Sequence, residues 1–110
     1  MPRRAAPNPR INAPRRVKNN TRLEAAALRW VGKCLGENRH ERQVRVYAQR
    51  LFDLTHQSLR LGSLDLHWLR LAALLHDIGR CVSDKRHPQE GARMILNAPL
   101  PLSAADRRAV

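Results

Sequence analysis

The sequence LLHDIG, at residues 74–79, places a histidine beside an aspartate at the end of a long apolar segment. Residues 64–75 carry apolar side chains around nearly every side of a helix, which predicts a buried central helix. His76 and Asp77 are therefore expected where water is scarce, and an unpaired carboxylate buried there costs several kcal/mol. Because a metal cation would neutralise the carboxylate and also bind the imidazole, the pair predicts a metal site.

Two more histidines are predicted to reach this pair. His40 begins a stripe on the expected second helix, whose other members are Val44, Tyr47, Leu51, Leu54 and Ser58. A lone histidine on an apolar face is more often a core residue than a ligand. The short connection to the next helix favours antiparallel packing, however, which brings His40 to His76 and Asp77. His87, one loop further on, can return to the same end of the bundle. Such imidazoles with a carboxylate suit a divalent transition metal.

His56 and His67 are expected outside this site. His56 follows His40 by 16 positions, which places it about 160° away around the same helix. His67 precedes His76 by nine positions, which places it about 180° away. Both histidines are therefore predicted to be surface or structural residues.

Start and stop signals locate the helices that must position the candidate ligands. Thr21 can cap a first helix that Gly36 ends, and a second helix spans residues 38–61. The sequence further predicts a third helix from a Ser63 cap to Gly79, a polar loop over residues 80–86, a fourth helix from Pro88 to Asn97, and a fifth from Ala104 after a Ser103–Asp106 capping box.

The composition favours an all-α protein with a single core. Hydrophobic residues make up 43% of the 110 residues and aromatic residues only 4%, and no strand-type alternation is visible. We therefore expect a compact bundle of about five helices over residues 21–110. The given sequence ends two turns into the last helix, which is expected to be incomplete.

The net charge of +12 is concentrated near the start of the chain. Residues 1–22 carry seven arginines or lysines and no acid, and four prolines interrupt them. With so few apolar side chains, residues 1–20 are predicted to form a disordered basic arm. Such an arm could contact nucleic acid or another polyanion weakly through phosphate charge, or it could be a solvated tail or an unremoved leader.

Cysteine usage and hydropathy bear on the compartment. Cys34 and Cys81 lie 47 positions apart and form no CxxC motif, so neither a zinc knuckle nor a disulfide framework is indicated. No apolar stretch reaches the ~20 residues that span a bilayer. We expect a cytoplasmic protein that makes no membrane contact.

These motifs together resemble the HD-domain superfamily of metal-dependent phosphohydrolases. The resemblance rests on the histidine at a helix start, on LLHDIG, and on the downstream HPxxGA motif at residues 87–92. It covers roughly residues 37–110. Within the superfamily, HxxQVxxYAxxLFD at residues 40–53 and the closing LPLSAADRRAV are most similar to the C-terminal helical domain of exopolyphosphatase/guanosine-pentaphosphatase proteins. Relative to that family the chain looks truncated at its C-terminus.

The resemblance implies metal ligands at His40, His76, Asp77 and His87, with Asp77 able to bridge two ions. Members usually add an aspartate on a later helix, and Asp106 comes too early in the motif order to match it. One or two divalent ions are expected. The imidazole and carboxylate ligands favour manganese, iron, cobalt, nickel or zinc over magnesium alone.

Two hypotheses about function follow. The first is an HD-type phosphohydrolase in which a metal-activated hydroxide attacks a nucleotide or other phosphate ester. Asp77 would then hold or bridge the metal, and Arg80, Lys85 or Arg86 could neutralise the substrate phosphate. The second is a non-catalytic HD-like module, a remnant or partner of an exopolyphosphatase-like protein, that binds polyanions through its basic arm. In either case a small domain with an unfinished helix could form a homodimer to cover apolar surface.

Overall fold

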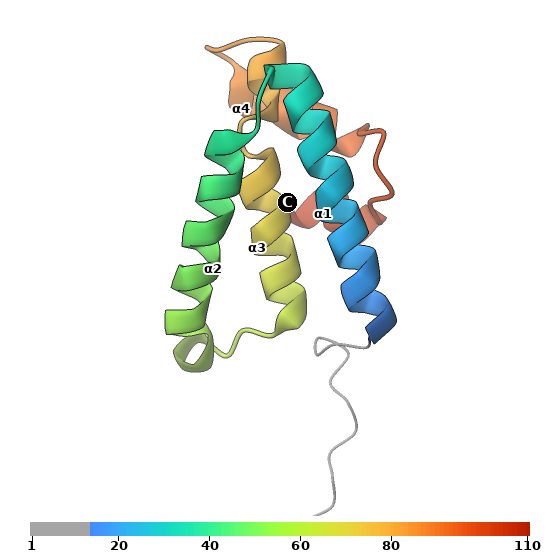
Figure 1. The fold of residues 1–110 in the computed structure, drawn as a ribbon. Helices are drawn as coiled ribbons and strands as arrows, with labels where there is room; N and C mark the ends of the chain where they lie inside the picture. Colours follow the sequence, from blue (N-terminus) through green and yellow to red (C-terminus); the bar gives the residue numbers. More distant parts are fainter. Residues whose placement is uncertain (1–13) are drawn as a thin grey trace, which may run out of the picture.

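The computed structural model describes the backbone of residues 14–110 and the side chains from Asn20 onward. The predicted all-α class is confirmed, since five α-helices and one short 3-10 helix account for the described secondary structure (Figure 1). Their bounds are α1 Pro14–Leu35, α2 Arg39–Leu59, α3 Ser63–Leu75, η1 Ile78–Cys81, α4 His87–Leu96 and α5 Ala104–Ala109. None of the helices in this range is long and apolar enough to cross a membrane.

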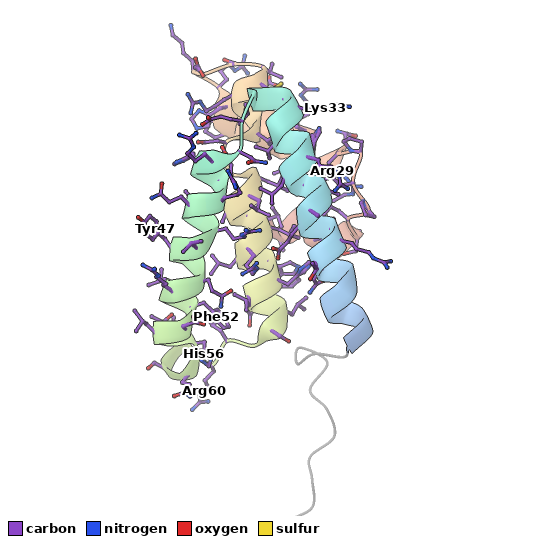
Figure 2. The ribbon with its side chains drawn as sticks, in the orientation of Figure 1. Arg29, Lys33, Tyr47, Phe52, His56 and Arg60 are labelled. Atoms are coloured by element: carbon purple, nitrogen blue, oxygen red, sulfur yellow. The ribbon has the colours of Figure 1, made fainter. Side chains whose placement is uncertain are left out.

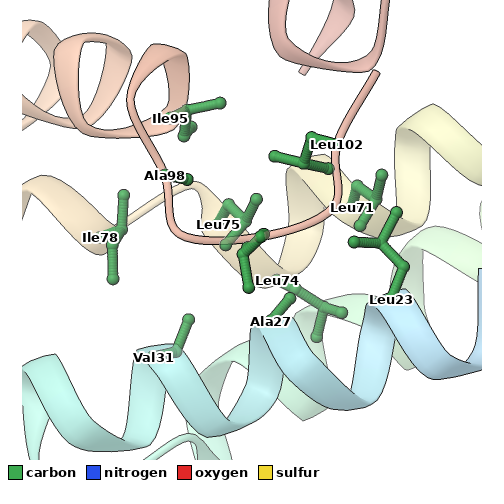
Figure 3. Packing of buried hydrophobic residues seen from close by; sticks show 11 residues of the cluster. Leu23, Ala27, Val31, Leu71, Leu74, Leu75, Ile78, Ile95, Ala98 and Leu102 are labelled. Atoms are coloured by element: carbon green, nitrogen blue, oxygen red, sulfur yellow. The ribbon is translucent and has the colours of Figure 1, made fainter.

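Helix α3 lies at the centre of the bundle, as its apolar sequence predicts. It packs against α1 on one side and α2 on the other (Figure 1). Leu71, Leu74 and Leu75 are completely buried. They form the middle of a core whose other members come from α1, η1, α4 and the segment after α4, and include Leu23, Ala27, Val31, Ile78, Ile95, Ala98 and Leu102 (Figure 3).

Helix α1 begins at Pro14, so the predicted start at a Thr21 cap is wrong. A proline suits the first turn of a helix, because its fixed φ is already helical and its missing N–H has no partner to lose there. No glycine or proline interrupts residues 15–31. The helix therefore includes residues 14–20 of the predicted arm, and residues 1–13 lie outside the part of the chain that the structure describes.

The apolar stripe predicted for α2 does not face the core. Tyr47, Leu51 and Leu54 are 56%, 60% and 82% exposed, and Figure 2 shows Tyr47 on the side of α2 away from α3. The buried side chains of α2 are instead Glu41 and Phe52. Since α2 packs mainly against α3, only a narrow stripe of α2 is covered. Arg45 is partly buried at this interface, and its Nη1 lies 3.4 Å from Glu24 Oε1 of α1.

The central helix is shorter than predicted at its C-terminal end. Its N-cap is Gly62, whose N–H donates to Asp65 Oδ2 at 2.8 Å, and Ser63 is the first helical residue rather than the cap. The helix ends at Leu75 instead of continuing to Gly79. His76 and Asp77 therefore lie in the turn between α3 and η1, at an end of the bundle and not inside a helix.

The predicted capping box of the last helix is confirmed. The Asp106 N–H donates to Ser103 Oγ at 3.0 Å, and the Ser103 N–H lies 3.4 Å from Asp106 Oδ2.

We expect Ser103→Ala to lower the free energy of unfolding by about 1 kcal/mol, because the first turn of α5 loses an acceptor. Urea unfolding followed by circular dichroism measures the change. The matched variant Ser58→Ala, at an exposed site inside α2, should change stability by less than half as much.

Candidate metal centre

The carboxylate of Asp77 is surrounded by the three histidines predicted to accompany it. Its Oδ2 lies 3.6 Å from His40 Nε2 and 3.3 Å from His76 Nε2. Its Oδ1 lies 3.7 Å from His87 Nε2. Asp77 is 14% exposed, so it sits at the base of the group. The structure therefore brings together all four residues proposed as metal ligands.

Three segments supply these side chains: the start of α2, the turn between α3 and η1, and the start of α4. His40 is the second residue of α2, His76 caps the C-terminal end of α3, Asp77 precedes η1, and His87 is the first residue of α4. Helices α2 and α3 run antiparallel, so the start of one lies beside the end of the other (Figure 1). The short turn through η1 then returns the chain to α4 at the same end.

Hydrogen bonds to backbone carbonyls orient two of the imidazoles. His76 Nδ1 lies 2.7 Å from the carbonyl oxygen of Ala73, and His87 Nδ1 lies 2.9 Å from that of Asp84. Since a carbonyl only accepts, Nδ1 is the donor in each ring, and Nε2 is left to face Asp77. Metal-binding histidines are commonly held in this way, with the second ring nitrogen bound to a carbonyl or carboxylate.

The spacing of the ligand atoms suits one metal ion. Nitrogen and oxygen ligands lie about 2.1 Å from a transition metal, so two ligands at a tetrahedral angle are about 3.4 Å apart. The contacts of His40 and His76 with Asp77, at 3.6 and 3.3 Å, match that separation. The ligand atoms of these three residues all lie within 4.8 Å of one another. The rings of His40 and His76 are tilted, with centroids 5.3 Å apart.

A pocket of about 360 Å³ adjoins His40 and includes Arg80 in its lining. Arg80 Nη1 lies 3.7 Å from Asp77 Oδ2, and its Nε lies 3.4 Å from Asp84 Oδ1. Arg80 therefore lies beside Asp77 and in the wall of this pocket, and its phosphate-binding role stays a prediction. Lys85 and Arg86 are exposed and do not line this pocket, so their role remains a prediction.

The same pocket contains residues that the sequence analysis did not select. Glu41 is 4% exposed, and it lines the pocket beside His40. Glu41 lies outside the apolar stripe predicted for α2, and a glutamate next to His40 carries no sequence signal of burial. Burial and a hydrogen bond to Cys81 raise the pKa of the Cys34 thiol, which also lines the pocket. Among the described residues, the group whose ligand atoms lie close enough together to hold a metal ion is His40, His76 and Asp77, and it does not include Cys34.

The two histidines excluded from the site by helical geometry do lie elsewhere. His56 stacks on Phe52, with ring centroids 5.0 Å apart. His67 is buried, and its Nε2 lies 3.3 Å from Asp106 Oδ1. Asp106 also accepts a hydrogen bond from Trp68 Nε1 at 3.0 Å. Its carboxylate is therefore held at a different part of the bundle and does not complete the ligand set.

The helical bundle and its histidine–aspartate cluster define a domain built around a candidate metal centre. A comparison with protein-family models matches residues 36–108 to the HD domain. The match covers well over half of the chain and includes all four candidate ligands, so the protein belongs to the HD domain family. No curated protein and no solved structure matched the chain.

Proposed function

We propose that this protein is a metal-dependent phosphohydrolase that hydrolyses a nucleotide or another phosphate ester. The observation that carries the proposal is the position of the Asp77 carboxylate, 3.3–3.7 Å from the Nε2 atoms of three histidines. Membership of the HD domain family supports the same reaction class. The exopolyphosphatase-like subgroup suggested by residues 40–53 makes inorganic polyphosphate a further substrate to test.

The ligands divide between the two oxygens of Asp77. His40 and His76 face Oδ2, and His87 faces Oδ1. This division allows Asp77 to hold one ion with His40 and His76, and a second ion with His87. When bound, a divalent metal supplies a water molecule of lowered pKa and positive charge beside the phosphoryl oxygens. Manganese, iron, cobalt, nickel and zinc suit these ligands better than magnesium alone.

Arg80 is the residue proposed to bind the substrate phosphate. Its guanidinium is about half exposed, and neither of its two carboxylate contacts is shorter than 3.4 Å. It can therefore turn toward a phosphate in the adjoining pocket, where two parallel N–H donors match two phosphate oxygens. Lys85 would contribute only if its loop moved, since it is exposed outside the pocket.

Metal content and hydrolysis of phosphate esters test the proposal together. Protein purified without chelator should contain about one or two divalent transition metal ions per chain. It should hydrolyse p-nitrophenyl phosphate, nucleotides or polyphosphate, lose the activity after chelation and regain it when metal is added back. Elemental analysis and phosphate release provide the readouts.

The matched control is His56→Ala, because His56 stacks on Phe52 and lies outside the centre. This variant should keep its metal and its activity. Metal at background level in chelator-free preparations, together with no hydrolysis after reconstitution with each of the five metals, would rule out the enzyme.

A further inference from the structure

We propose that a second pocket, between α1, α2 and α3, binds a small organic anion that carries a hydrogen-bond donor. The pocket has a volume of about 470 Å³, which is in the range of small-molecule sites. Its lining includes Glu24, Leu28, Arg45, Ser63, His67 and Arg70. The proposal does not depend on the function of the metal centre.

The pocket is separate from the metal centre. His67, in its wall, precedes His76 by nine residues, so the two are about 13 Å apart along α3. In Figure 1 the metal-centre end of α3 lies near α4, whereas Ser63 begins α3 at the other end. No residue lining one pocket lines the other.

Two buried polar atoms in this pocket lack a hydrogen-bond partner. Within the described part of the chain, Ser63 Oγ and His67 Nδ1 are the buried side-chain nitrogen or oxygen atoms without one. They lie four residues apart, on the same face of α3, and both residues line the pocket. Buried polar groups are nearly always satisfied in native proteins, so two neighbouring exceptions in one pocket indicate a ligand.

The contact between His67 and Asp106 indicates which kind of hydrogen-bonding group would satisfy His67 Nδ1. Asp106 Oδ1 lies 3.3 Å from His67 Nε2, and a carboxylate oxygen can only accept. This contact favours the tautomer that carries its hydrogen on Nε2 and leaves a lone pair on Nδ1. The group that satisfies Nδ1 must therefore be a donor, such as an N–H or O–H of the ligand. The Ser63 hydroxyl can donate or accept beside it.

The charges in the pocket leave an excess of positive charge. Glu24 is 7% exposed and accepts from Arg70 Nε and Nη2, each at 2.8 Å. Arg70 Nη1 donates to Gln49 Oε1 at 2.7 Å, so all three of its donor nitrogens are used. Arg45 makes only a 3.4 Å contact with Glu24. Two guanidinium groups thus share one carboxylate, and Arg45 has donors available for an anion.

The apolar part of the wall is formed by Ala25, Leu28 and Leu66, and Asn20 and Thr21 add polar groups to the lining. The three parts of the pocket therefore specify three parts of a ligand. An anionic group binds near Arg45, a hydrogen-bond donor meets His67 Nδ1 and Ser63 Oγ, and a carbon skeleton or flat ring lies against the apolar wall. A nucleoside monophosphate has this combination of groups, and we choose adenosine monophosphate as the probe.

Titration of the full chain with adenosine monophosphate, in the presence of chelator, tests the site. We expect the amide resonances of the pocket residues and the Nδ1 resonance of His67 to move with a single dissociation constant. Arg45→Gln should weaken binding roughly tenfold, because it removes the charge of the group that faces the anion. Ser63→Ala should weaken it severalfold. The only contact of Arg45 with Glu24 is long, at 3.4 Å, and Ser63 Oγ has no hydrogen-bond partner to lose, so both variants should remain folded.

Two controls separate this site from the metal centre. Arg42→Gln removes an exposed arginine from the same helix outside the pocket and should leave the affinity unchanged. His76→Ala should also leave it unchanged. The proposal is overturned if no pocket resonance moves at millimolar probe, if Arg45→Gln and Ser63→Ala bind as well as the parent protein, or if His76→Ala abolishes binding.

Discussion

Asp77→Asn is expected to lower both metal affinity and phosphate ester hydrolysis by at least about 100-fold. Changes to groups that merely orient a ligand already cost 10- to 100-fold, and Asp77 is proposed as a ligand itself. Its carboxylate is the group that His40, His76 and His87 all face. An amide of the same size removes the negative charge and replaces one oxygen by a donor, which cannot bind a cation.

Metal titration and the rate of phosphate release measure this effect, and circular dichroism shows whether the bundle remains folded. Asp84→Asn is the matched control, since Asp84 also lines the pocket next to Arg80 but is 82% exposed and lies outside the ligand cluster. We expect Asp84→Asn to retain metal. Unchanged metal affinity in Asp77→Asn would exclude Asp77 as a ligand.

Gly79→Ala is expected to destabilise the protein by at least about 3 kcal/mol. A Cβ at Gly79 would lie only 1.9 Å from the carbonyl oxygen of His87 and 2.5 Å from the backbone nitrogen of Gly91. These are backbone atoms, so no side-chain rotation can relieve the overlap. Helix α4 would have to move away from η1, and His87 would move with it. The same variant should therefore also weaken the metal centre.

The control for this prediction is Gly32→Ala in α1. A Cβ there would have Asn38 Nδ2 as its nearest contact, at an ordinary 3.7 Å. Alanine is a better helix former than glycine, so this variant should gain roughly 0.5 to 1 kcal/mol. Urea unfolding of both variants measures the difference. Equal stability of the two variants would mean that the close approach of η1 and α4 does not constrain the fold.

Several parts of the fold and of the site could be predicted from the sequence because they depend on local patterns. The largely apolar sequence of residues 64–75 predicts the central helix, and Ser103 with Asp106 predicts the start of α5. The angular positions of His56 and His67 around their helices also separate them from the candidate ligands. These patterns extend over only a few residues, so they can be interpreted without knowing which helices pack against one another.

The errors arose where distant residues decide the outcome. Tyr47, Leu51 and Leu54 form an apolar stripe by spacing, yet α2 turns them to solvent. The covered stripe instead carries Glu41, Phe52 and Arg45, and Arg45 contacts Glu24 of α1. The predicted end of α3 at Gly79 is wrong for a similar reason, since the close approach of Gly79 to the backbone of α4 is invisible in the local sequence.

The sequence by itself determined the helical class, the central helix, the identity of the four candidate ligands and the end of the bundle where they meet. Those features follow from hydrophobic periodicity, capping and residue chemistry. Only the tertiary structure decided that Asp77 is the residue the three histidines share, that Arg80 joins them while Lys85 does not, and that Ser63 and His67 open onto a second pocket. These are matters of side-chain direction and pairing between helices, which depend on contacts that no local pattern encodes.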